Sequence, residues 1–171
     1  YQEIDPSPEA SVFFAGILYQ KGKEAEAMEY YKKAVDQEPD AFKKAKSLYK
    51  IAQLLAKKGQ KSKARNYARQ ALKSNPNMGK AYLLIASMYA SSANTCGKNE
   101  FEIRMVYTAA LNKAKRAAAV DPSIASKAAK YIKNYRSLEP SKKLIFNMTI
   151  KPGTAHTVKC WINETVKVPQ K

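Results

Sequence analysis

The residue types that most often perform chemistry are rare in this chain, which has a single histidine, His156, and two cysteines, Cys96 and Cys160. His156 and Cys160 are four residues apart in a stretch with strand periodicity, where they would be separated by roughly 13 Å at about 3.3 Å per residue. One metal ion could not bind both side chains, and no second histidine completes a metal site or a catalytic triad. We therefore predict that the protein is not an enzyme and has no metal, no cofactor and no small-molecule substrate.

The two cysteines leave two interpretations open. Cys96 falls in the only long insertion of the repeat pattern described below, and Cys160 lies in the only segment without that pattern. A disulfide between Cys96 and Cys160 would tie these two segments together. Two reduced, buried cysteines are the alternative, which a reducing compartment would favour.

The net charge of +17 is distributed unevenly along the chain. Residues 1–40 contain nine acidic residues and four lysines, whereas no acidic residue stands between Asp40 and Glu100. Such asymmetry indicates either an anionic partner or a solvated basic face.

Nucleic acid is one anionic partner that this charge could attract. The basic residues of 46–73, however, are spread around the expected helices and do not line one groove. No apolar run approaches the ~18 residues that a membrane span needs, so no transmembrane span is expected.

Small and turn-forming residues recur along the chain and indicate where helices and turns lie. Four of them reappear 37 positions later: Gly22, Ala27, Ala34 and Pro39 as Gly59, Ala64, Ala71 and Pro76. Glycine readily adopts the positive φ that a turn between two helices requires, and proline ends a helix. Alanines seven residues apart lie on one helical face, where a larger side chain would push a neighbouring helix away. The pattern predicts pairs of closely packed antiparallel helices.

These residues resemble the tetratricopeptide repeat, a helix–turn–helix of about 34 residues. The resemblance implies a mainly α fold, a right-handed α-solenoid, with units at about 8–41, 45–78 and 79–123 and a capping helix at 124–138. About twelve residues around Cys96 are inserted in the third unit. The stretch "YQEIDP" resembles the end of a preceding repeat, so we expect the chain to belong to a longer array.

From residue 141 to 171 the period changes from helical to alternating, which is typical of a β-hairpin. Phe146, Met148 and Ile150 form one predicted apolar face, and Pro152 and Gly153 occupy the predicted connection. We expect this hairpin to cap the array, with the helix at 124–138 as its nearest support. Residues 101–123 and 159–165 are similar to the ends of tetratricopeptide proteins from the envelope of anaerobic Gram-negative bacteria. That similarity implies an extracytoplasmic location, in the periplasm or cell envelope, with a cytoplasmic one as the alternative.

The tetratricopeptide resemblance also implies where a partner binds, because the family binds extended peptides in a concave groove lined by the first helix of each unit. Carried over position by position, the groove residues are Val12, Gly16, Tyr19, Lys46, Tyr49, Lys50, Gln53, Lys80, Leu83, Leu84 and Ser87. Family members that clamp an acidic C-terminal tail of a chaperone have Lys, Asn or Arg at six of these positions, and none is matched here. We therefore expect a protein-binding scaffold for a peptide with apolar and acidic residues; a purely structural spacer is the alternative.

Overall fold

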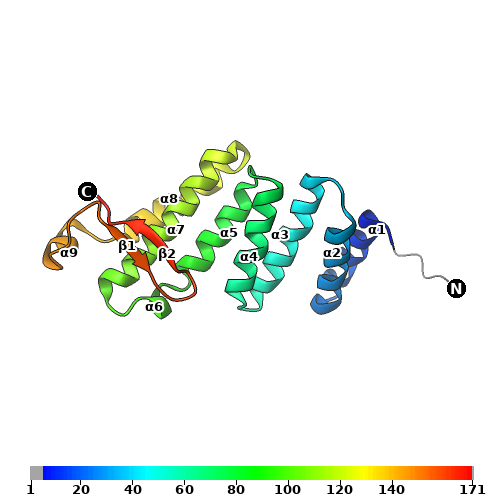
Figure 1. Cartoon of the computed structure of the whole chain (residues 1–171), viewed down its shortest axis with the longest axis horizontal. Coiled ribbons are helices and arrows are strands. Elements are labelled where there is room, and N and C mark those ends of the chain that lie inside the picture. Colours follow the sequence, from blue (N-terminus) through cyan, green and yellow to red (C-terminus); the bar gives the residue numbers. More distant parts are fainter. Residues whose placement is uncertain (1–5, 171) are drawn as a thin grey trace. The chain divides into compact units, whose positions relative to one another are not determined.

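The computed structural model describes residues 6–170 and divides into two compact units (Figure 1). The N-terminal unit runs to Pro76 and the C-terminal unit begins at Asn77. Both are built mainly from helices, which confirms the predicted mainly α class. No helix in the described part of the chain is long and apolar enough to cross a bilayer. The predicted domain boundaries stay predictions, and the expected tail of a preceding repeat lies outside the described residues except for Pro6.

The N-terminal unit consists of two helical hairpins, whose helices are α1 (Pro8–Gln20), α2 (Glu24–Gln37), α3 (Ala41–Lys57) and α4 (Lys61–Ser74). The two hairpins turn in the same way. Gly22 and Gly59 have φ angles of 75° and 74°, and the residue after each glycine donates its backbone N–H to the carbonyl five residues before it, over 2.9 Å. This is the Schellman motif, which satisfies the last carbonyls of a helix.

The alanines that recur between the two hairpins are all buried. Ala27, Ala64 and Ala71 have no exposed surface, and Ala34 is 1% exposed. The sequence therefore repeats small side chains where α1 packs on α2 and α3 packs on α4. A side chain larger than a methyl group would not fit at these helix contacts. Asp40 begins α3 by accepting a hydrogen bond from the backbone N–H of Lys43 over 2.8 Å.

The C-terminal unit repeats the hairpin with an insertion and then departs from it. Its helices are α5 (Gly79–Ala90), the short α6 (Ala93–Cys96), α7 (Glu100–Val120), α8 (Ala125–Leu138) and α9 (Lys142–Asn147), with a 3-10 turn at Pro122–Ile124 before α8. Helix α7 packs against both α5 and α8. Gly79 is needed for close approach, since a Cβ atom there would lie 2.6 Å from the Cβ of Asp121.

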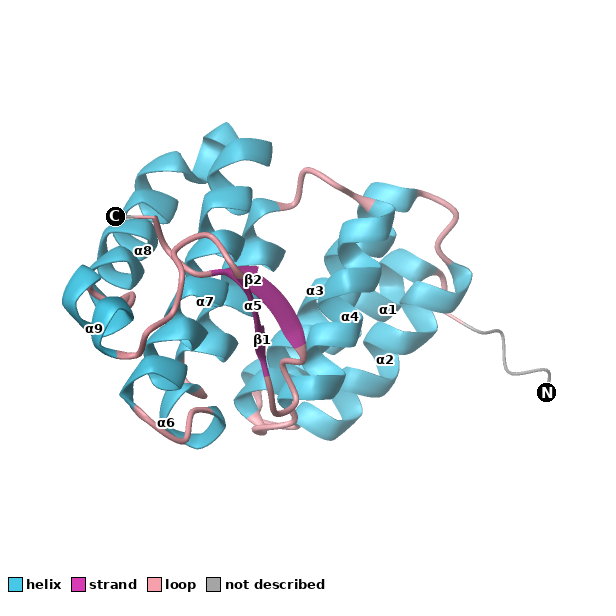
Figure 2. Cartoon of the chain, turned by 60° about the vertical axis from the view of Figure 1, so that its left-hand side comes forward, coloured by secondary structure: helices cyan, strands magenta, loops and turns pink. Residues whose placement is uncertain are grey.

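Two strands, β1 (Ala155–Val158) and β2 (Glu164–Lys167), form an antiparallel hairpin beside α7 (Figure 2). Their register pairs Ala155 with Lys167 and Thr157 with Thr165. The predicted terminal hairpin is thereby confirmed, but its main support is α7 rather than the helix at 124–138.

The predicted first strand through Phe146, Met148 and Ile150 is wrong. Ser141 accepts a hydrogen bond from the backbone N–H of Leu144 and begins α9, and Thr149, with a φ of 56°, ends it. The alternation was misleading because Phe146 is 83% exposed while its neighbour Ile145 is buried.

The turn of the hairpin is also displaced from its predicted place. Pro152 and Gly153 precede β1, and the connection between the strands spans residues 159–163. Cys160 and Asn163 take positive φ angles in this connection, of 71° and 41°. A positive φ is uncommon outside glycine, which explains why the sequence pattern pointed to the Pro–Gly pair.

Polar and covalent links join the hairpin to the helices of the same unit. Cys96 and Cys160 form a disulfide, with Cα atoms 5.3 Å apart. Next to it, the indole Nε1 of Trp161 donates to the Ser92 hydroxyl over 3.1 Å, and its ring contacts that of Tyr89 edge-on. Trp161 is thus a packing residue between the hairpin and α5.

Glu164 extends these links along β2. One carboxylate oxygen accepts a hydrogen bond from the Tyr89 hydroxyl over 2.7 Å, and the other pairs with the Lys113 ammonium, also at 2.7 Å. Because these groups are partly buried, such charge-assisted bonds are stronger than exposed ones. The start of β2 is therefore held to both α5 and α7.

Candidate functional site

Two hollows lie along α1 and α3 of the N-terminal unit. The larger has a volume of about 360 Å³ and is lined by residues that include Val12, Lys46 and Lys50. The smaller, of about 120 Å³, includes Tyr19, Gln53 and again Lys50. Tyr31 and Lys50 line both hollows, so the two adjoin.

The structure brings together five of the seven groove residues predicted in this unit. Val12 and Tyr19 come from α1, about two helical turns apart, and Lys46, Lys50 and Gln53 come from α3 at spacings of about one turn. Val12 is 40% exposed and Tyr19 is 45% exposed, so each presents apolar surface that a ligand could cover. Gly16 and Tyr49 are half-buried and line neither hollow.

Sequence reasoning missed the contribution of the second helix to this site. Tyr31, on α2, is 6% exposed and lies at the junction of the two hollows. Burial raises the pKa of its phenol, and the nearby Tyr19 phenol raises it further, so Tyr31 stays neutral at physiological pH and can donate a hydrogen bond. Tyr31 lies between Ala27 and Ala34 in the repeat, and this position alone gave no sign that it faces a hollow.

Ion pairs between helices border the larger hollow. The Glu9 carboxylate of α1 pairs with the Lys43 ammonium of α3 at 2.9 Å, and both residues line the hollow together with Glu38. The hydrogen bond with Lys43 lowers the pKa of Glu9, and the same bond raises the pKa of Lys43. Lys43 is therefore partly neutralised, which leaves Lys46 and Lys50 as the cations that a ligand can meet.

A second ion pair lies beside Tyr19, which lines the smaller hollow. The Lys57 ammonium pairs with Glu24 at 2.6 Å and lies 5.7 Å from the ring centre of Tyr19. The hydrogen bond with Lys57 lowers the pKa of Glu24. The cation over its face holds the Tyr19 ring at the edge of the hollow.

The predicted groove residues of the C-terminal unit form a separate set on α5. Lys80 is exposed and Leu84 is half-buried, but Leu83 is only 4% exposed and presents almost no surface to a ligand. The Ser87 hydroxyl donates to the carbonyl of Leu84 over 2.9 Å, so its donor is already used within the helix. This set offers fewer available contacts than the residues along α1 and α3.

His156 and Cys160 were the first residues considered for chemistry, and both take part in contacts that hold the hairpin in place. The His156 ring meets that of Phe101 edge-on, and burial lowers the pKa of its imidazole, while Glu102 opposes and Lys159 adds to this shift. Cys160 is in the disulfide with Cys96. Among the described residues, no group of three or more His, Cys, Asp or Glu side chains is arranged to hold a metal ion.

Comparison with known proteins agrees with the repeats. Two family models of the tetratricopeptide repeat match residues 8–40 and 45–78. A solved yeast structure, titled the TPR2B domain of Sti1 in complex with pHsp70, superposes with a TM-score of 0.60 at 18% identity, covering 76% of this chain and 96% of that chain. No curated protein sequence matches. Residues 8–40 and 45–78 are therefore tetratricopeptide repeats, in a chain whose fold is similar to that of a solved TPR domain.

Proposed function

We propose that this protein is a non-enzymatic interaction module whose N-terminal unit binds an extended peptide segment of another protein in the hollows along α1 and α3. The observation that carries the proposal is the lining of these hollows: apolar and aromatic surface from Val12, Tyr19 and Tyr31 lies beside the cations Lys46 and Lys50. A peptide with apolar anchors and neighbouring acidic residues complements both features.

The similarity to the Sti1 domain supports this proposal at the level of the fold. That structure is titled a complex with pHsp70, so a related helical framework holds a protein ligand there. The partner of this chain differs in its requirements, because the positions that grip an acidic chaperone tail in the family carry Val12, Gly16, Tyr49 and Gln53 here. Recognition then depends on the apolar floor more than on a cluster of cations.

A peptide-display selection against the purified protein tests the proposal. We expect the selected peptides to combine apolar or aromatic residues with Asp or Glu, and the Lys50→Glu variant to bind them about tenfold more weakly. Lys63→Glu is the matched control, since Lys63 is exposed on α4 and lines neither hollow. If selection yields no peptides, or if both variants bind them like the parent protein, the hollows are not a binding site and the unit is a structural spacer.

We also propose that the protein works in an oxidising, extracytoplasmic compartment. The disulfide between Cys96 and Cys160 supports this, because such bonds persist in oxidising compartments and are rare in reducing ones. Cell fractionation of the native source tests the location, and recovery of the protein only from the cytoplasm would refute it.

A further inference from the structure

A large cavity of the C-terminal unit lies along the unpaired edge of β2. Its volume is about 650 Å³. One side is formed by residues 165–170, and the other by Thr108, Asn112 and Lys115 of α7. No residue of β1 lines this cavity, although β1 is the only strand that pairs with β2 in the described chain. Gly153, just before β1, also lines the cavity, but every other lining residue belongs to 108–139 or 165–170. Most of the cavity therefore follows the side of β2 that faces away from β1.

The backbone of β2 directs hydrogen-bonding groups to that side. Val168 donates its N–H to the carbonyl of Thr154 and accepts from the N–H of Gly153, each over 2.9 Å, so Val168 faces the first strand. Residues along an antiparallel strand alternate between facing the partner strand and facing away from it. By this alternation the N–H and C=O groups of Thr165 and Lys167 point away from β1, toward the cavity.

Charged side chains surround these backbone groups. Lys115, Arg136 and Lys167 line the cavity from α7, α8 and β2, and none of them forms an ion pair with another described residue. Glu139 also lines it and is only 9% exposed. Its carboxylate accepts one hydrogen bond, from the Thr108 hydroxyl over 3.1 Å, and pairs with no cation of the described chain.

We propose that this cavity binds an extended, mainly acidic segment of a partner protein, which adds to β2 as a third strand. The main chain of the segment pairs with Thr165 and Lys167, as in other cases of strand addition to an exposed sheet edge. Its carboxylates meet Lys115, Arg136 and Lys167. The site lies in the C-terminal unit and does not depend on the function proposed for the hollows of α1 and α3.

Proline substitution at matched positions tests strand addition. The probe is a capped, fluorescein-labelled hexapeptide of alternating Glu and Val, measured by fluorescence anisotropy. Thr165→Pro removes an N–H that faces the cavity, whereas Thr157→Pro removes the N–H of the residue paired with it, on the opposite edge of the same sheet. Either change also breaks the hydroxyl contact between Thr157 and Thr165. We expect about tenfold weaker binding for Thr165→Pro and less than about twofold for Thr157→Pro.

A modified probe tests the same point on the unaltered protein, in case a proline variant fails to fold. N-methylation of alternate peptide nitrogens removes the donors needed for pairing but keeps the side-chain charges. We expect the N-methylated probe in the pairing register to bind about tenfold more weakly than the parent probe. Equal binding by the two would overturn strand addition.

Charge reversal tests the chemistry of the ligand. The pair Lys115→Glu with Arg136→Glu changes two lining cations, and the control pair Lys127→Glu with Lys130→Glu changes two exposed cations of α8 that do not line the cavity. We expect only the first pair to abolish binding of the acidic probe. Equal loss with both pairs would show diffuse attraction and overturn the site. Concentration-dependent dimerisation that Thr165→Pro removes would show that a second copy occupies the edge, which would also overturn the proposal.

Discussion

The helices of the two units are held together in different ways. In the N-terminal unit, each hairpin has a glycine with a positive φ between its two helices, and the helices meet through alanines with almost no exposed surface. The C-terminal unit keeps buried alanines at Ala110 and Ala117 but adds a disulfide, a tryptophan and a paired glutamate to hold its hairpin. A repeat can be specified by small residues at fixed spacing, whereas a single added element needs links of its own.

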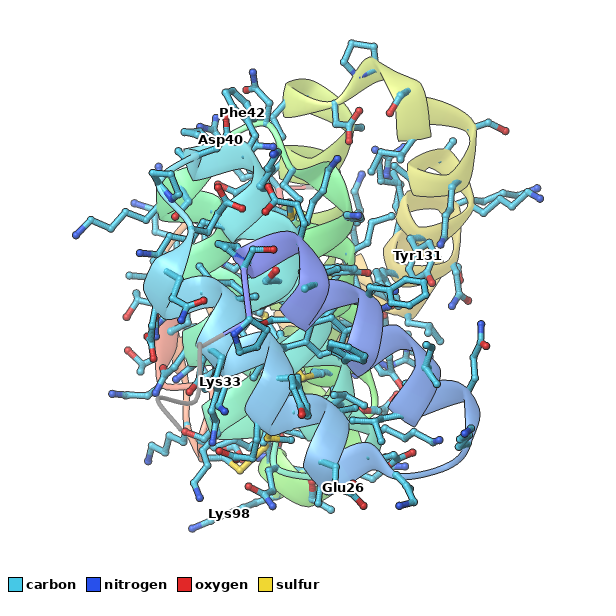
Figure 3. All side chains as sticks on the ribbon, turned by 90° about the vertical axis from the view of Figure 1, so that its right-hand side faces the viewer. Glu26, Lys33, Asp40, Phe42, Lys98 and Tyr131 are labelled. Atoms are coloured by element: carbon cyan, nitrogen blue, oxygen red, sulfur yellow. A yellow bond between two sulfur atoms is a disulfide. The ribbon has the colours of Figure 1, made fainter. Side chains whose placement is uncertain are left out.

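The same difference extends to the surfaces that the two units offer. The N-terminal unit presents helix side chains along shallow hollows, and Phe42, next to Asp40 at the start of α3, is 60% exposed (Figure 3). The C-terminal unit presents the backbone of a strand edge beside a charged cavity. Side chains and backbone select ligands by different rules, so we expect changes in one unit to leave the properties of the other intact.

Removal of the disulfide should give the largest separation between the units. Cys96→Ser with Cys160→Ser opens a loop of 64 residues and should destabilise the C-terminal unit by about 4 kcal/mol in the loop-entropy estimate. Hydrogen exchange with mass spectrometry should then rise in peptides from α5 to β2 and stay unchanged in α1 to α4. Free-thiol counting on the unfolded, unreduced parent protein is the control, and two reactive thiols there would contradict the bond itself.

Overpacking a repeat alanine should affect the N-terminal unit by a smaller amount. Ala64→Leu places a larger side chain where no surface is exposed and should destabilise that unit by about 2 kcal/mol. Lys63→Leu introduces the same side chain at the exposed preceding position and should have little effect. Urea unfolding followed by hydrogen exchange measures both variants. Equal stability of the two would mean that the alanines are not spacers between helices.

A modest difference in acid sensitivity should also distinguish the units. The pKa of His156 in the folded chain is below its ordinary value of 6.5, mainly because of burial, so the unfolded chain takes up the proton first. The stability contribution of neutral His156 is therefore present above about pH 6.5 and is lost as the pH falls below it. The lowered carboxyl pKa values of Glu9 and Glu24 in the N-terminal unit cause losses only below their ordinary value of 4.5.

Hydrogen exchange at pH 7.5 and pH 5.5, corrected for the intrinsic rates, measures this difference. We expect protection to decrease in β1 and the adjoining part of α7 and to be unchanged in α1 to α4. His156→Phe keeps an aromatic ring against Phe101 and should remove the effect. A titration of His156 by NMR that gives a pKa above 6.5 would reverse the expected sign.

The fold of the N-terminal unit could be predicted from the sequence because its determinants are local and repeated. Gly59 and Ala64 occupy the same repeat positions as Gly22 and Ala27. The pattern in each hairpin therefore supported the interpretation of the other. The segment from Leu144 to Ile150 had no such support. Its seven residues fit an alternating pattern, but the choice between helix and strand was decided by the cap at Ser141 and by burial of Ile145 alone.

The candidate site could be predicted only in part, for a related reason. Positions on α1 and α3 follow from the repeat register, and five of the seven line the hollows. The place of Tyr31 and the pairing of Glu9 with Lys43 depend on the distance between helices. Residue spacing along a single helix does not predict that distance. The cavity beside β2 could not be found at all, because it is formed by separate segments spread between Thr108 and Gln170.

The covalent link between Cys96 and Cys160 has a consequence for biosynthesis. A ribosome makes α7, α8, α9 and β1 between the two cysteines, and the bond cannot form until all of these have emerged. Throughout that interval Cys96 is an unpaired thiol on a growing chain, open to mispairing with other proteins. The N-terminal unit has no such dependence, since both of its hairpins are complete before Cys96 is synthesised. The positions of the two cysteines therefore determine the order of maturation. The helical repeats can fold first, and oxidation and closure of the hairpin come last.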